Sequence, residues 1–111
     1  MITFRKTESE ERYQREKKEK VGCALCSERG KSLGKRWVIM PNEYPYDKFA
    51  ECHEMIALAD HKMSPSLVDI FYLWAKRKEI SDMGYHMIMW NFPIRQSVPG
   101  HFHLHIIKLK T

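Results

Sequence analysis

The sequence contains no long hydrophobic run, because each apolar stretch is soon interrupted by a charged residue or a histidine. A helix that crosses a membrane needs about 20 consecutive, mostly apolar residues. The first 20 residues lack the apolar segment of a secretory signal and are dense in Lys, Arg and Glu. Cysteine is scarce, with three residues, and this odd count argues against a disulfide framework. We therefore expect a cytoplasmic protein that does not contact a membrane.

Size and composition indicate one globular domain. The chain has 111 residues, of which 43% are hydrophobic and 12% aromatic, and this is enough to build a hydrophobic core. The net charge of +5 resides in residues 1–36, whereas residues 37–111 are neutral. This basic third could attract nucleic acid through its electric field, or it could serve only as a solubilising surface. Both interpretations stay open.

Periodicity and turn residues predict an α+β fold with an antiparallel sheet of about five strands, one main helix and a basic N-terminal helical arm. The arm comprises residues 1–20, whose polar faces predict a solvated helix or a partly disordered segment, and the folded domain comprises residues 21–111. Ser64 and Pro65 are typical of a helix start, and this helix should end near Gly84. We expect a loop over residues 22–34 and strands over residues 37–40, 53–59, 85–90 and 101–109.

Three histidines alternate with apolar residues in the last predicted strand. Successive side chains of a strand point to opposite faces, so His101, His103 and His105 should share one face. The opposite face, with Phe102, Leu104 and Ile106, should anchor the strand to the core. Burying three titratable rings without a task is costly, which favours catalysis over a purely structural or metal-binding role.

Two cysteines at metal-ligand spacing precede this strand in the sequence. Cys23 and Cys26 form a Cys-x-x-Cys pair followed by Gly30, a pattern that serves metal binding or redox chemistry. We interpret Cys52 as a small buried hydrophobic residue, and His53 and His86 as ordinary strand residues.

The run from His101 to Ile107 resembles the signature of the histidine triad (HIT) superfamily of nucleotide hydrolases and transferases. The resemblance extends over residues 21–111. The segments 42–46 (Asn-Glu-Tyr-Pro-Tyr) and 53–61 are similar to a conserved strand–turn–strand of that family. The segment 85–91, which ends in Asn91, and the run Gln96-Ser97-Val98 are similar to the strand and phosphate-binding loop that lead into the triad.

The resemblance implies a HIT-like fold and a two-step mechanism on a nucleotide-containing small molecule. His103 would attack the α-phosphorus of a phosphoramidate, a dinucleoside polyphosphate or a nucleotidylated adduct, and the covalent nucleotidyl-histidine would then be hydrolysed or passed to an acceptor. His105 and Ser97 would assist. Asn91, Gln96, Ser97 and His105 would bind phosphate oxygens or the leaving group, and Asn42 the ribose, although Asn91 at a strand end could equally be a turn residue.

The resemblance also implies a structural zinc ion and a homodimer. Zinc-binding members use two cysteines near the N-terminus, a histidine after the second strand and the first histidine of the triad. Here these are Cys23, Cys26, His61 and His101. Zinc bound by His101 would orient His103 without acting as the Lewis acid.

Two alternatives to a small-molecule enzyme remain. One is a zinc-bearing module that binds nucleic acid through the basic N-terminal third, with the triad idle. The other is removal of nucleotide adducts from DNA or RNA ends by the same triad chemistry.

Overall fold

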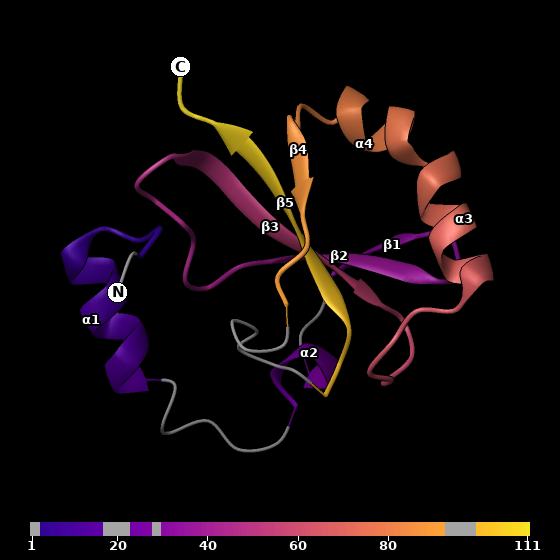
Figure 1. Cartoon of the computed structure of the whole chain (residues 1–111), viewed down its shortest axis with the longest axis horizontal. Coiled ribbons are helices and arrows are strands. Elements are labelled where there is room, and N and C mark those ends of the chain that lie inside the picture. Colours follow the sequence, from indigo (N-terminus) through magenta and orange to yellow (C-terminus); the bar gives the residue numbers. More distant parts are fainter. Residues whose placement is uncertain (1–2, 17–22, 28–29, 93–99) are drawn as a thin grey trace.

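One five-stranded antiparallel sheet, in the order β1-β2-β3-β5-β4, forms the centre of the computed structural model (Figure 1). The structure describes residues 3–16, 23–27, 30–92 and 100–111. The strands are β1 (Lys31–Leu33), β2 (Trp37–Pro41), β3 (Ala50–Leu58), β4 (Met87–Met89) and β5 (His103–Leu109). The predicted α+β class and antiparallel sheet are therefore confirmed.

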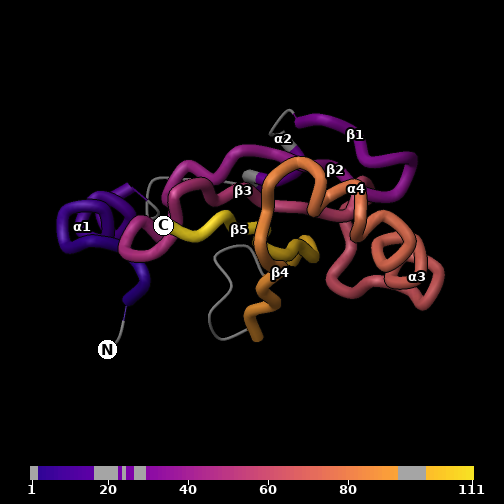
Figure 2. The backbone as a smooth tube through the Cα atoms, turned by 90° about the horizontal axis from the view of Figure 1, so that it is seen from above, coloured from indigo at the N-terminus to yellow at the C-terminus, as the bar shows by residue number. Residues whose placement is uncertain are grey.

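The helices are α1 (Thr7–Glu16), α2 (Ala24–Ser27), α3 (Leu67–Ala75) and α4 (Arg77–Asp82). Helices lie at the two ends of the molecule, and α2 packs on one face of the sheet (Figures 1 and 2). Figures 1 and 2 both place α1 at the end of the molecule opposite α3 and α4. Among the described residues, no helix has the length and apolar character that crossing a membrane requires.

Alternation along the strands gives the sheet two differently covered faces. On one face, Leu73 of α3 and Ile80 of α4 pack against side chains of the sheet and form the main core. The sheet and its flanking residues contribute Leu33, Trp37, Ile39, Ile56, Leu58, Phe102, Leu104 and Ile106. The other face holds Leu25 of α2 against Met40 and Ala57. Phe102, Leu104 and Ile106 thus anchor the last strand to the core, as the period-two pattern predicted.

The main helix begins two residues later than expected and is divided. Ser66, not Ser64, caps α3: its hydroxyl accepts from the Asp69 N–H (3.1 Å), and the Asp69 carboxylate accepts from the Ser66 N–H (2.8 Å). This reciprocal pair of hydrogen bonds is a capping box, a motif in which the capping Ser and an acidic residue three positions later bond to each other's backbone N–H. Lys76 (φ −93°, ψ 2°) then separates α3 from α4.

Several strands also differ from the prediction, and β4 covers only Met87–Met89 of the predicted residues 85–90. β1 lies within residues expected to be a loop, because three residues carry too little periodicity to reveal an edge strand. β3 begins at Ala50 rather than near His53. β5 begins at His103, so His101 precedes the strand instead of opening it.

The N-terminal helix is docked on the turn at residues 43–47. The Asp47 carboxylate accepts from the Lys6 N–H (2.6 Å) and from the Ser9 hydroxyl. Arg12 donates to the Glu43 carbonyl at 2.6 Å. Residues 7–16 are helical, which is one of the two forms expected for the arm, and polar contacts fix them to the domain even though none of them is buried.

Candidate functional site

Two cysteines and two histidines from distant parts of the chain form a cluster able to hold a metal ion. The donor atoms of Cys23, Cys26, His61 and His101 all lie within 4.8 Å of one another. Cys26 Sγ is 3.0 Å from His61 Nδ1 and 3.4 Å from His101 Nδ1, and Cys23 Sγ is 3.5 Å from His101 Nδ1. Sulfur and nitrogen ligands of a tetrahedral ion are about 3.5 Å apart at ordinary bond lengths. The four side chains therefore fit one ion, and they are the four predicted from the sequence.

The surroundings of these ligands also suit a cation. His101 is 2% exposed, and its Nε2 donates to the Leu58 carbonyl at 2.7 Å. That bond leaves the Nδ1 lone pair facing the cysteines, which is how metal-bound histidines are commonly oriented. The adjacent Cys23 thiol, together with burial, raises the pKa of Cys26. Two neighbouring thiolates repel each other, and a bound cation would remove that repulsion.

His103 lies beside this cluster, on the face of the sheet that α2 covers. It is 1% exposed and pairs with Ala57 across the β3–β5 ladder. His103 Nδ1 donates to the His101 carbonyl at 3.0 Å. The proton is then on Nδ1, and Nε2, which is buried and has no hydrogen-bond partner among the described residues, keeps its lone pair. Burial lowers the pKa of His103, so the ring is neutral at pH 7.

His105 belongs to a hydrogen-bonded chain that also includes His53 and a backbone N–H. The Tyr46 N–H donates to His53 Nδ1 at 2.8 Å, so this nitrogen is an acceptor. Neutral His53 then carries its proton on Nε2 and donates it to His105 Nδ1 at 2.7 Å. Burial, and then the positive charge of Arg5, lowers the pKa of His53 to about 4. Burial, followed by charge on His53, His103 and Arg5, lowers the pKa of His105 to about 3. Both rings are therefore neutral at pH 7.

The asparagines predicted to contact the nucleotide lie at the two ends of this chain. The Asn42 amide nitrogen is 3.3 Å from His53 Nδ1, which is an acceptor. The Asn91 amide contacts His105 Nε2 (3.2 Å) and the Tyr46 hydroxyl (2.9 Å). The proton on His105 Nε2 requires an acceptor, which the Asn91 oxygen becomes when the amide is turned by 180°. Asn91 is thus a buried partner of His105 rather than a simple turn residue.

Sequence reasoning missed the role of His53. The pattern predicts an ordinary strand residue, yet His53 is 5% exposed and lies between the Asn42 amide at its Nδ1 and His105 at its Nε2. The spacing of His53, Met55 and Ala57 puts their side chains on one face of β3. Only the pairing of β3 with β5 brings the His53 side chain next to His105. Cys52 is half-buried, near Glu54 (3.8 Å), and burial raises its pKa. Gln96 and Ser97 lie outside the described residues.

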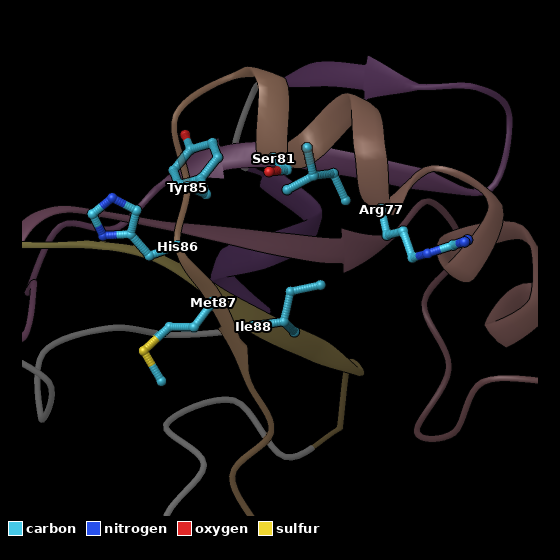
Figure 3. A pocket seen from close by; sticks show the side chains of 7 residues that line it. Arg77, Ser81, Tyr85, His86, Met87 and Ile88 are labelled. Atoms are coloured by element: carbon cyan, nitrogen blue, oxygen red, sulfur yellow. The ribbon is translucent and has the colours of Figure 1, made fainter.

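A separate pocket opens between α4 and β4, with a volume of about 290 Å³ (Figure 3). It is lined by Arg77, Ile80, Ser81, Tyr85, His86, Met87 and Ile88. None of the predicted site residues lines this pocket, so it is distinct from the site formed by the metal ligands, His103 and His105.

Comparison with known proteins adds no relative: no family model matches the chain, and neither a curated protein nor a solved structure is significantly similar to it. The functional argument therefore depends on the residues and their geometry.

Proposed function

We propose that this protein is an HIT-type nucleotidyl hydrolase or transferase whose nucleophile is Nε2 of His103. One observation carries the proposal: a buried imidazole nitrogen with a free lone pair has no hydrogen-bond partner among the described residues, while the other nitrogen of the same ring donates to the His101 carbonyl. A buried polar atom without a partner costs about 1–3 kcal/mol. Such atoms call for an explanation, and a reactive role is one.

The reaction takes place in two balanced steps. His103 Nε2 attacks the α-phosphorus of a nucleotide conjugate, a P–N bond forms, and the bond to the leaving group breaks. The leaving group departs with the bonding electron pair and takes a proton from water. Water, or another acceptor with an O–H group, then attacks the phosphorus and gives its proton to the hydroxide left by the first step, while the P–N bond breaks and its electron pair returns to the now neutral ring. The His101 carbonyl stabilises the positive charge that His103 gains between the two steps.

His105 assists by holding the site in its working tautomer, because His53 and Asn91 occupy its two ring nitrogens and fix its orientation. Cys23, Cys26, His61 and His101 would hold zinc, because a set of two thiolates and two imidazoles is typical of structural zinc sites. The ion would supply a fixed anchor for His101. The backbone would carry that anchoring to His103, two residues further along the chain.

The N-terminal third favours the enzyme over the nucleic-acid-binding alternative. Arg5 donates to the Tyr44 carbonyl (2.8 Å) and pairs with Glu10 (3.1 Å), and Arg12 donates to the Glu43 carbonyl. Two arginines of the arm thus already have acceptors within the chain, and the side chain of Arg5 is largely buried. Binding of DNA that weakens steeply with salt would support the alternative.

The proposal is tested by trapping the covalent intermediate. Wild type is incubated with an adenosine phosphoramidate, a diadenosine polyphosphate or a 5′-adenylated oligonucleotide, and then denatured rapidly for intact-protein mass spectrometry. We expect a nucleotidyl adduct in wild type and in the control variant His86→Ala, since His86 is exposed. We expect none in His103→Ala with unchanged metal content. Identical product formation by wild type and His103→Ala on all three substrates would overturn the proposal.

A further inference from the structure

Asp69 of α3 places a buried carboxylate against the segment that carries His61. Asp69 is 2% exposed. Its Oδ2 pairs with Lys62 Nζ at 2.8 Å and its Oδ1 with Arg36 Nη1 at 2.9 Å. The backbone is held as well, because the Asp69 carbonyl accepts from the Trp37 indole N–H at 3.0 Å. Asp69 is therefore fixed against the core, and it can in turn fix the side chains that reach it.

Lys62 connects this carboxylate to both histidines of the metal cluster. It directly follows His61, and its carbonyl accepts from the Phe102 N–H at 2.8 Å. Phe102 directly follows His101 and is 3% exposed. The Lys62–Phe102 bond thus joins the two histidine-bearing segments immediately beside the ligands.

His61 needs such a tether more than His101 does. His61 is exposed, so core packing does not set its position. His101 is buried and bonded to the Leu58 carbonyl. The distance between the two ligands consequently depends on where Lys62 lies.

We propose that Asp69 and Lys62 are positioning residues of the metal centre: the Asp69–Lys62 ion pair holds the segment of His61 against the segment of His101, so that the two imidazoles are set for one ion before it binds. The inference rests on the metal centre proposed above. Partners outside the ligand shell typically change metal affinity by about 10–100-fold when they are removed. Lys62 acts through one further bond, and we expect about a tenfold effect.

Arg36 provides a matched control. Arg36 and Lys62 pair with the two oxygens of the same carboxylate, at 2.9 and 2.8 Å, and their side chains are 42% and 40% exposed. Only Lys62 is adjacent to a ligand. Lys62→Met and Arg36→Met should therefore lower the thermal stability of the metal-free protein similarly but act differently on the metal.

The test compares wild type, Lys62→Met and Arg36→Met in two measurements. The first is the affinity for Zn²⁺, obtained by competition with a chromogenic chelator. The second is hydrogen exchange of the Phe102 amide in metal-free protein. We expect Lys62→Met to weaken zinc binding about tenfold and to speed exchange at Phe102. We expect Arg36→Met to change the affinity by less than about twofold and to leave the Phe102 exchange rate near that of wild type.

Equal affinities in all three proteins, or an equal loss in both variants, would overturn the positioning role while leaving the metal centre intact. Absence of zinc binding by wild type would overturn the metal centre and the inference with it. The exchange rate at Phe102 separates these cases, because it reports on the tether without any metal.

Discussion

Acidification should destabilise this protein well above the pH at which carboxylates titrate, because His53 and His105 are buried as neutral rings. Their pKa values are about 4 and about 3 in the folded protein, against about 6.5 for an unfolded histidine. Both values are lowered, so between these limits the unfolded chain binds more protons than the folded one. The folded protein is therefore most stable, with respect to these two rings, above about pH 6.5, and its free energy of unfolding falls as the pH is lowered.

The expected size follows from these pKa values. Lowering the pH from 7 to 5 should reduce the free energy of unfolding by about 2 kcal/mol for each ring. Each pH unit below the pKa of the unfolded histidine reduces it by about 1.4 kcal/mol per proton. The two rings together should remove about 4 kcal/mol from a free energy of unfolding that is typically about 5–15 kcal/mol. The pKa of Asp69 lies well below its usual range, because hydrogen bonds from Lys62, Ser66 and Arg36 outweigh the effect of burial. The contribution of the Asp69 carboxylate to the free energy of unfolding is therefore lost only at a pH below that of the histidine effect.

Urea unfolding at pH 7, 6 and 5 measures this effect in zinc-free protein. Wild type and the control His86→Gln should show the full loss of unfolding free energy between pH 7 and pH 5, because His86 is exposed and does not belong to the buried pair His53 and His105. The double variant His53→Gln/His105→Gln should show a smaller pH dependence, of which the part due to buried His103 remains, although its stability at pH 7 is lower. A double variant with the same pH slope as wild type would refute the reasoning.

Two further predictions concern the metal centre and the helix surface. Removing the metal with a chelator should lower Tm by about 10 °C, because a ligand at 100 times its Kd stabilises by about 2.7 kcal/mol; calorimetry of wild type and Cys23→Ser checks this, and a Tm that does not respond to the chelator in wild type would contradict it. The homodimer implied by the HIT resemblance should use α3, whose Leu67, Val68 and Phe71 are 78%, 55% and 70% exposed. Phe71→Glu should then convert a dimer into a monomer in light scattering, and a mass that is monomeric in wild type would remove the dimer proposal.

Local patterns in the sequence predicted the parts of the fold that local geometry controls. The period of two in β5 correctly put His103 and His105 on one face and Leu104 and Ile106 on the other, since this alternation is a property of any strand. It did not reveal the short edge strand β1. The choice of Ser64 over Ser66 as the helix cap overlooked the reciprocal bond that Asp69 makes with Ser66.

The sequence by itself determined which residue types are available: an alternating histidine strand, a cysteine pair at metal-ligand spacing and an antiparallel α+β order. Only the tertiary structure decided which of them meet. His53 reaches His105 because β3 pairs with β5, and Lys62 reaches Asp69 because α3 packs against the start of β2. Periodicity sets the direction of a side chain within its own element, whereas the partner of that side chain depends on contacts between residues far apart in the chain.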